Sequence, residues 1–350
     1  MNPELRLVFW ELTARCNLRC RHCRAEAGEA AAGELTTEEI LAAARAIRAE
    51  ANPLLILTGG EPLAREDFFT IAETCTALFT RVALATNGTL IDDAIARRIQ
   101  TTGIQRVSIS LDGATAGTHD AFRGVVGSFD AALRGLLALQ RAGLSAQINV
   151  TATRHNEHEI AQLLDYALEL GVDAFHLFLL VPVGCGVAID EEERLSPLAG
   201  EEMLRQLARK SRAYAERIQI KATCAPQYFR VMREMTHDEG VPLPKMGHGM
   251  SAVTRGCLAG SSVCFLSRSG DVQPCGYLPL AAGNIRTQSL GTIWRDSELF
   301  AVLRDPQRLI GKCGGCDYRA VCGGCRARAY AVCGDAFAEE PDCAYQPGDQ

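Results

Sequence analysis

The chain has 350 residues, of which 47% are hydrophobic and 22% charged, with 32 glycines. This composition is typical of a folded globular protein and excludes a disordered one. The formal net charge of −6 argues against a nucleic-acid or anionic-membrane partner, because both require a basic surface. No apolar stretch approaches the length of a membrane span, and no leader pattern precedes the first apolar run. We therefore expect a cytoplasmic protein.

The chain contains fifteen cysteines, three within 16–23 and ten between 224 and 343. A reducing compartment disfavours stable disulfides, so clustered cysteines there indicate metal ligands. The remaining two, Cys75 and Cys185, stand alone.

Short apolar runs alternate with amphipathic stretches from residue 5 to residue 182. The apolar runs are continuous, as in a parallel sheet covered on both faces, and the amphipathic stretches have helical periodicity. A Thr-x-x-Glu box at Thr36 predicts the start of the first helix. Six such units favour a partial (βα)6 barrel of the TIM type over a doubly wound sheet. The predicted strands are 5–12, 53–60, 81–88, 104–113, 145–153 and 173–182, and the predicted helices are 36–50, 64–79, 89–103, 128–143 and 155–171.

Polar residues follow several of these strands directly, at 58–61, 86–88 and 110–113, and the first three cysteines follow the first strand. In a parallel βα fold the carboxyl ends of the strands meet at one edge, where active sites are built. The sequence therefore predicts a site at this edge.

The rest of the chain differs in character. The sequence predicts a core barrel over 1–190, a connecting helical region over 191–256 with helices near 198–216 and 226–237, and a cysteine-rich domain over 257–350. The last part is rich in glycine and short on apolar runs, so we expect it to bury little core and to depend on bound metal.

Cys16, Cys20 and Cys23 form a Cys-x3-Cys-x2-Cys motif. Thiolates select zinc or iron–sulfur clusters, and a structural zinc site requires a fourth ligand. The nearest candidate, His22, adjoins Cys23 and is poorly placed to turn to the same metal. A [4Fe-4S] cluster on three thiolates leaves one iron open to a small molecule. The motif resembles that of the radical S-adenosylmethionine enzymes, in which S-adenosylmethionine binds that iron; His22 occupies a position that is usually aromatic.

The same resemblance assigns further cofactor-binding residues. "TGGEP" at 58–62 resembles the family motif that holds the methionine amino group. The alternative is that these residues are turn formers or helix caps. The residues that the resemblance implies for the S-adenosylmethionine pocket are Gly59, Gly60, Glu61, Asn87, Ser110, Asp112, Asn149 and, for the methionine carboxylate, Arg123.

The C-terminal cysteines resemble the SPASM extension of this family, although the last gap has two residues where three are usual. The resemblance implies one or two auxiliary [4Fe-4S] clusters; one or two structural zinc ions are the alternative. Cys224 could replace Cys264 as a ligand or face the substrate, whereas Cys75, Cys185 and Cys333 are expected to be ordinary buried residues. The implied ligand sets are Cys257, Cys264, Cys275 and Cys325 for one cluster and Cys313, Cys316, Cys322 and Cys343 for the other.

Longer strings such as "HDAFRGVVGSF", "KATCAPQYFRVMR" and "CGGCRARAY" are similar to the heme synthases of the siroheme-dependent alternative heme pathway, over residues 5–347. The resemblance implies a radical oxidoreductase that uses a 5′-deoxyadenosyl radical. It would convert two propionates of iron-coproporphyrin III to the vinyl groups of heme b, with ferredoxin or flavodoxin as electron donor. His176 is expected to be a satisfied core histidine, with a side chain that faces the pocket as the alternative. The candidates for holding this polyanion are Lys221, Arg230, Arg233, Arg255, Arg326 and Arg328.

Two other functions remain open. A SPASM peptide maturase or a heme d1-type enzyme would share the cysteines, although a maturase usually carries an N-terminal peptide-recognition domain, and only four residues precede the first predicted strand here. A non-catalytic iron–sulfur protein would leave "TGGEP" unexplained.

Overall fold

The computed structural model describes residues 4–240 and 256–348. Its strands form one sheet in the order β10-β9-β8-β1-β2-β3-β4-β5-β6-β7. From β8 to β7 every neighbouring pair is parallel, whereas β9 and β10 add an antiparallel edge. The strands are β1 Leu7–Glu11, β2 Leu54–Thr58, β3 Val82–Thr86, β4 Arg106–Ser110, β5 Ser145–Ala152, β6 Ala174–Leu179, β7 Gln219–Thr223, β8 Val263–Leu266, β9 Asp271–Gln273 and β10 Gly283–Asn284.

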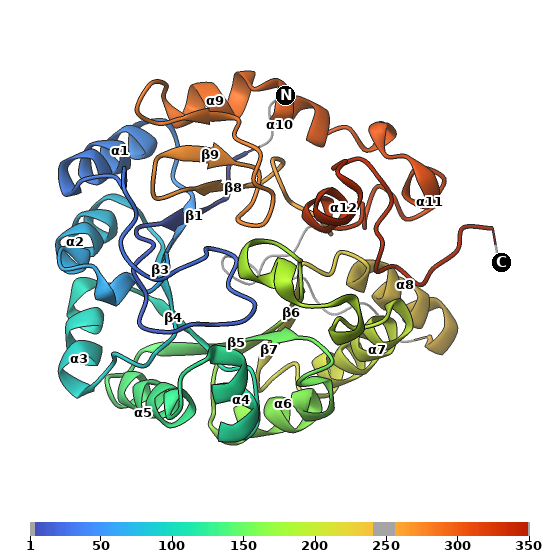
Figure 1. The fold of residues 1–350 in the computed structure, drawn as a ribbon, viewed down its shortest axis with the longest axis horizontal. Coiled ribbons are helices and arrows are strands. Elements are labelled where there is room, and N and C mark those ends of the chain that lie inside the picture. The colour runs from blue at the N-terminus through green and yellow to red at the C-terminus, as the bar shows by residue number, and fades with distance from the viewer. Residues whose placement is uncertain (1–3, 241–255, 349–350) are drawn as a thin grey trace.

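The helices surround the curved sheet on its outer side (Figure 1). All six predicted strands and all five predicted helices of the barrel are present, so the α/β barrel prediction is confirmed. Helix α4 is an addition that the sequence patterns did not reveal. The helices are α1 Thr37–Glu50, α2 Phe68–Leu78, α3 Asp93–Thr102, α4 Ala116–Arg123, α5 Ser128–Arg141, α6 Ile160–Glu169, α7 Pro197–Ala213, α8 Tyr228–Glu239, α9 Leu290–Asp296, α10 Glu298–Leu303, α11 Gly311–Gly314 and α12 Arg326–Cys333.

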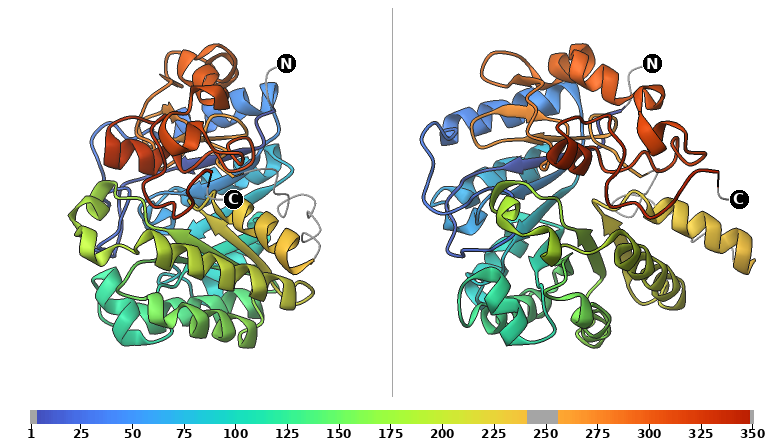
Figure 2. Two further views of the ribbon diagram at one scale, coloured as in Figure 1. Left: turned by 90° about the vertical axis from the view of Figure 1, so that its right-hand side faces the viewer. Right: turned by 45° about the vertical axis from the view of Figure 1, so that its right-hand side comes forward.

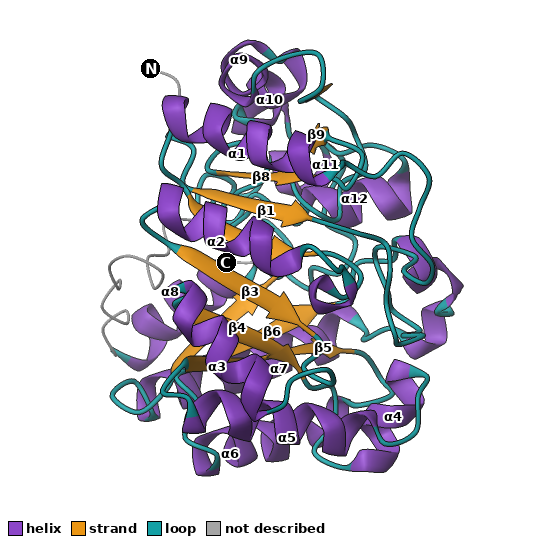
Figure 3. Ribbon diagram, turned by 90° about the vertical axis from the view of Figure 1, so that its left-hand side faces the viewer, coloured by secondary structure: helices purple, strands orange, loops and turns teal. Residues whose placement is uncertain are grey.

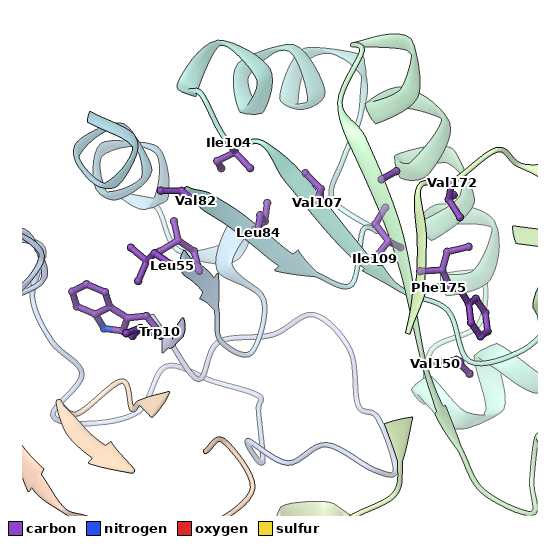
Figure 4. Packing of buried hydrophobic residues seen from close by; sticks show 14 of the residues in the cluster. Trp10, Leu55, Val82, Leu84, Ile104, Val107, Ile109, Val150, Val172 and Phe175 are labelled. Carbon is purple, nitrogen blue, oxygen red and sulfur yellow. The ribbon is translucent and has the colours of Figure 1, made fainter. Parts of the chain in front are cut away.

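The main hydrophobic core lies between the sheet and these helices. Alternate residues of each strand, such as Trp10, Leu84, Val107 and Phe175, point toward the helices and are fully or almost fully buried (Figure 4). The first helix begins as predicted, because Thr36 and Glu39 form a reciprocal capping box. The strand positions between the core residues face the concave interior of the barrel.

The sheet extends beyond the predicted six strands on both sides. β7, in the region expected to be a helical connection, pairs with β6, and β8 from the cysteine-rich part pairs with β1. Residues after 256 also belong to the main core, including Leu266, Val272, Trp294 and Phe300. The expectation that this part buries little core is therefore wrong, because it completes the sheet and shares the hydrophobic core of the barrel.

The arrowheads of β1, β3 and β8 point the same way, which defines the carboxyl edge of the sheet (Figure 3). The segment with α11 and α12 lies between the β8–β9 hairpin and helices α7 and α8, on the side where the ring of strands is open (Figures 1 and 2). In the described parts of the chain, no helix combines the length and apolarity needed to cross a bilayer.

Candidate functional site

The loop between β1 and α1 brings the thiols of Cys16, Cys20 and Cys23 together at the carboxyl edge. Burial, with smaller contributions from the charges of Glu61, Cys20 and Cys23, raises the pKa of Cys16 to about 11, which places the three sulfur atoms within electrostatic reach of one another. Backbone N–H groups at Leu18 and Ala27 point at Cys16 Sγ and Cys23 Sγ, at 3.5 and 3.4 Å. Such donors stabilise thiolates that ligate a cluster.

The turn after β2 packs directly against this loop. Gly60 N–H donates to the Thr13 carbonyl and Glu61 N–H donates to the Arg15 carbonyl, both at 2.7 Å. A Cβ on Gly60 would lie 2.5 Å from the carbonyl oxygens of Ala14 and Arg15. Glycine is required here because the cysteine loop passes against the turn, a reason that the sequence alone did not supply.

Helix α4 and the segment after β6 hold the other side of the loop. Arg19 and Arg21 donate backbone hydrogen bonds to the carbonyls of Arg123 and Phe122, at 3.1 and 3.0 Å. The Cys185 N–H donates to the Cys23 carbonyl at 2.9 Å. Cys185 is therefore no ordinary core residue, because its thiol also lies within electrostatic reach of Cys23.

Glu61 is fully buried at the end of β2. Its carboxylate accepts hydrogen bonds from Thr86 Oγ1 at 2.8 Å, Asn87 N–H at 2.8 Å and Leu63 N–H at 3.1 Å. Burial raises the pKa of Glu61, and these donors offset part of that effect. The carboxylate links the carboxyl ends of β2 and β3 and has lone pairs left for a further donor.

Asp112 and Arg123 form a buried ion pair, with 2.6 Å between Oδ2 and Nη2. Burial, the largest single effect, would raise the pKa of Asp112, but Arg123, the neighbouring histidines and the Thr151 N–H together outweigh burial and lower the pKa. Arg123 Nη1 also lies 3.6 Å from Cys20 Sγ. α4 thus carries Arg123 to the active edge, where its charge is already shared between a carboxylate and a thiol.

His22 occupies the position between Cys20 and Cys23 without turning toward the thiols. Its ring stacks on Phe122 with 4.2 Å between centroids and 13° between planes. Burial lowers the pKa of His22 to about 4, so the ring is neutral near pH 7. The side chain serves as the aromatic residue of the motif.

The remaining predicted pocket residues also lie near this edge. Asn87 Nδ2 donates to Asn17 Oδ1 at 2.8 Å and lies 3.9 Å from Cys16 Sγ. Ser110 and Asn149 are directly opposite each other on β4 and β5. The structure therefore brings the predicted residues that follow or end four strands to one edge of the sheet.

A second group of thiols lies where the C-terminal part meets the barrel. The Cys224 and Cys325 side chains are hydrogen-bonded to each other. Burial, with smaller contributions from the charges of Cys257 and Cys325, raises the pKa of Cys275 to about 12. Cys224 has a left-handed backbone, φ 54°, which is rare for a residue with a side chain and marks a constrained position.

Cys264 does not join that group, contrary to the expectation. It lies on β8 opposite Val8 of β1 and is fully buried in the main core. Only burial acts on its thiol pKa, with no contribution from another cysteine. Cys224, the residue weighed as its replacement, takes the fourth place. Cys75 is buried as expected, but Cys333 is exposed.

The third group is formed by the last cysteines. Cys313, Cys316, Cys322 and Cys343 line one cavity together with Arg230 and Tyr345. Backbone N–H groups of Glu340 and Tyr318 point at Cys313 Sγ and Cys316 Sγ, at 3.2 and 3.4 Å. This set agrees with the grouping that the sequence resemblance implied.

Most of the basic residues proposed for the substrate serve other contacts. Arg230 is paired with Glu201 and Glu234, and Arg326 donates to the Ala336 and Ala338 carbonyls. Arg233 is exposed, and Arg255 lies outside the described residues.

Arg328 is fully buried and joins several parts of the fold. It donates to the Leu179, Leu180 and Cys224 carbonyls at 3.2, 3.0 and 2.8 Å. Its guanidinium also pairs with Glu340 at 3.1 Å. Arg328 therefore fixes the second thiol group against the end of β6 and is not available to a substrate.

Two features bear on the kind of metal. Within residues 4–240 and 256–348, no three His, Cys, Asp or Glu side chains converge closely enough to surround a single ion. The thiols nevertheless gather in three groups, and thiolate groups of this kind bind zinc or iron–sulfur clusters.

Sequence reasoning missed the contacts that couple the barrel to the C-terminal part. Glu11, buried at the end of β1, pairs with Arg24 at 3.3 Å and with Arg268 at 2.9 Å. Arg24 also packs over the Phe265 ring. The available signal was a charged residue at the end of an otherwise apolar strand, which indicates a buried ion pair.

Comparison with known families shows two matches. Residues 10–167 match the Radical SAM superfamily, and residues 257–317 match the SPASM iron-sulfur cluster-binding domain.

Three curated relatives match almost the whole chain. The AdoMet-dependent heme synthase of Methanosarcina barkeri is 48% identical, with 99% of each chain covered. That of Nitratidesulfovibrio vulgaris is 44% identical over 99% of this chain and 94% of its own. The pre-heme d1 synthase of Dinoroseobacter shibae is 33% identical over 96% and 85%.

Among solved structures, SuiB of Streptococcus suis bound to the precursor peptide SuiA superposes with a TM-score of 0.76 at 17% identity, over 99% of this chain and 77% of that one. At this identity the likeness shows a shared fold.

Proposed function

Because the chain belongs to the radical S-adenosylmethionine superfamily and carries a SPASM domain, we propose that it oxidatively decarboxylates two propionates of iron-coproporphyrin III to vinyl groups and so forms heme b. The enzyme is an oxidoreductase that uses S-adenosylmethionine, a [4Fe-4S] cluster and auxiliary iron–sulfur clusters. The near-full-length similarity to AdoMet-dependent heme synthases carries the proposal.

The residues of the first thiol group fit the radical-generating centre. We assign Cys16, Cys20 and Cys23 as ligands of a [4Fe-4S] cluster, since they are three thiols with N–H donors aimed at two of them. When bound, this cluster and S-adenosylmethionine supply a 5′-deoxyadenosyl radical. Glu61 has lone pairs for the methionine ammonium, and Asn87, Ser110 and Asn149 lie near the same edge of the sheet.

Arg123 is already engaged by Asp112, which changes the role we assign to it. Its guanidinium holds the Cys20 side of the loop and compensates negative charge there. A methionine carboxylate that contacts Arg123 would share its guanidinium with the buried Asp112.

The second and third thiol groups suit the redox balance of the reaction. Each propionate loses a hydrogen atom, carbon dioxide and one electron as it becomes a vinyl group. An auxiliary iron–sulfur cluster, bound by the second or third thiol group, would accept that electron. We assign Cys224, Cys257, Cys275 and Cys325 to one auxiliary cluster and Cys313, Cys316, Cys322 and Cys343 to another. Cytoplasmic ferredoxin or flavodoxin is the proposed electron donor.

An anaerobic assay tests the proposal. Reconstituted protein with S-adenosylmethionine, a reductant and iron-coproporphyrin III should produce heme b and 5′-deoxyadenosine. A variant with Cys16, Cys20 and Cys23 replaced by Ala should produce neither, whereas Cys333→Ala, at an exposed thiol, should be fully active. Cleavage of S-adenosylmethionine with an unchanged porphyrin mass would exclude the heme assignment and retain the radical one.

The other candidates predict different outcomes. A pre-heme d1 synthase activity would modify a different tetrapyrrole, and a maturase would modify a peptide and leave porphyrins unchanged. Iron and zinc analysis of the same sample tests the cluster assignment, because zinc in place of iron would restore the structural-zinc alternative.

A further inference from the structure

A polar row crosses the concave face of the sheet on β4 to β7. Ser110 lies opposite Asn149, Asn149 opposite His176, and His176 opposite Lys221. Neighbouring residues on the same strands, such as Ile109, Ile148, Phe175 and Ile220, belong to the core under the helices. Because successive side chains of a strand alternate between faces, the row points into the barrel.

Barrel interiors of this class are usually filled by branched apolar side chains. Here the inward positions of β4 to β7 include Arg106, Gln147, His176 and Lys221 and, among these described strand residues, no Asp or Glu. Arg106 donates to Ser145 Oγ at 3.0 Å and Gln219 Oε1 at 3.4 Å, both uncharged partners. The described inward positions of β4 to β7 therefore carry basic side chains and no carboxylate.

Gln147 determines which ring nitrogen of His176 carries the hydrogen. Its Nε2 donates to Asn149 Oδ1 at 2.7 Å and lies 3.0 Å from His176 Nδ1. An amide NH2 only donates, so Nδ1 is the acceptor and the hydrogen of the neutral ring is on Nε2. Burial, with the charges of Lys221 and Arg106, lowers the pKa of His176 to about 3, which keeps the ring neutral.

The Nε2–H of His176 is buried and has no hydrogen-bond partner among the described residues. An unsatisfied buried donor is destabilising, so native structures rarely contain one without a reason. The expectation of a satisfied core histidine is thus wrong. Asn149 also offers hydrogen-bond donors, because its side-chain oxygen accepts from Gln147 and its amide hydrogens remain for another acceptor.

We propose that His176 Nε2–H and the Asn149 amide bind a carboxylate of the porphyrin substrate inside the barrel, with Lys221 and Arg106 supplying the compensating charge. This inference rests on the proposed function and identifies which of its residues hold a propionate. A propionate fits because it accepts several hydrogen bonds and carries a charge opposite to those of Lys221 and Arg106. The carboxylate of S-adenosylmethionine has the same chemistry, so the test must separate the two.

Two substitutions of similar size isolate the donor. His176→Gln retains an N–H near the position of Nε2, whereas His176→Met does not. In anaerobic holoprotein, absorbance titration with iron-coproporphyrin III should show a Kd at least about tenfold higher for His176→Met, the loss of one charge-assisted hydrogen bond. His176→Gln should stay within about threefold of the wild type. His237→Met, at an exposed histidine, is the control and should leave the Kd unchanged.

Two further titrations identify the carboxylate. The propionate methyl ester of the same iron porphyrin should bind both His176 variants equally well, because it has no carboxylate to lose. The Kd for S-adenosylmethionine should be the same in both variants. A change in S-adenosylmethionine affinity alone would assign the row to that ligand and overturn the proposal, as would equal porphyrin affinity for the Met variant and the wild type. If the wild type neither binds nor converts iron-coproporphyrin III, the proposed function fails and this inference fails with it.

Discussion

Gly60→Ala tests whether the turn after β2 positions the cysteine loop by contact. The added Cβ would lie 2.5 Å from two backbone oxygens, whereas ordinary van der Waals contact begins at 3.4 Å, so the segments must separate by about 0.9 Å. Both obstacles are backbone atoms, which cannot rotate away. The φ of Gly60 is not in the left-handed region, so the effect is purely steric.

The separation would weaken the two 2.7 Å hydrogen bonds from Gly60 and Glu61 to the loop, next to Cys16. Overpacking of this kind costs about 1–3 kcal/mol, and a displacement of about 1 Å at a reacting centre can cost about 100-fold in rate. We therefore expect 5′-deoxyadenosine formation by Gly60→Ala to fall by about 10- to 100-fold.

Gly117→Ala is the matched control, because Gly117 lies in α4 with open space around its Cβ position. It should be fully active and about 0.5–1 kcal/mol more stable, since alanine favours a helix over glycine. The reasoning would be refuted if Gly60→Ala matched Gly117→Ala both in its rate of 5′-deoxyadenosine formation and in its iron content.

Three further predictions follow from buried groups. Cys224→Ala should lose auxiliary iron in elemental analysis while Cys264→Ala keeps it; the reverse loss would reinstate Cys264 as the ligand. Arg328→Met should lower the thermal midpoint of the anaerobic holoprotein, because it leaves the buried carboxylate of Glu340 uncompensated at a cost of about 3–5 kcal/mol. Adding Glu340→Gln should recover part of that loss, and no recovery would contradict the ion-pair explanation. Burial lowers the pKa of His119 from 6.5 to about 4. As the pH falls between these two values, the unfolded chain takes up a proton that the folded chain does not, so the stability of the folded chain falls. His119→Asn should flatten the change in thermal midpoint between about pH 7 and about pH 5, and an unchanged slope would show that another group dominates.

The local patterns of the sequence were sufficient for the barrel and the first thiol group. Cys16, Cys20 and Cys23 lie within one loop, so their spacing alone brings them together. The six strands and the capping box at Thr36 likewise depend on neighbours a few residues away. The sequence also placed Glu61 and Asn87 at strand ends, and those ends meet because parallel strands share a carboxyl edge.

Only the tertiary structure decided contacts that depend on strand pairing. The sequence favoured Cys264 as a ligand, with Cys224 as its possible replacement. The register of β8 against β1 turns Cys264 toward the core, and a shift of one residue would have turned it the other way. Helix α4 carries Arg123 to Asp112, and the neighbouring strands β5 and β6 bring Gln147 and Asn149 against His176. The sequence contains these residues without their pairing, because the partners are far apart along the chain and meet only when the sheet closes around its interior.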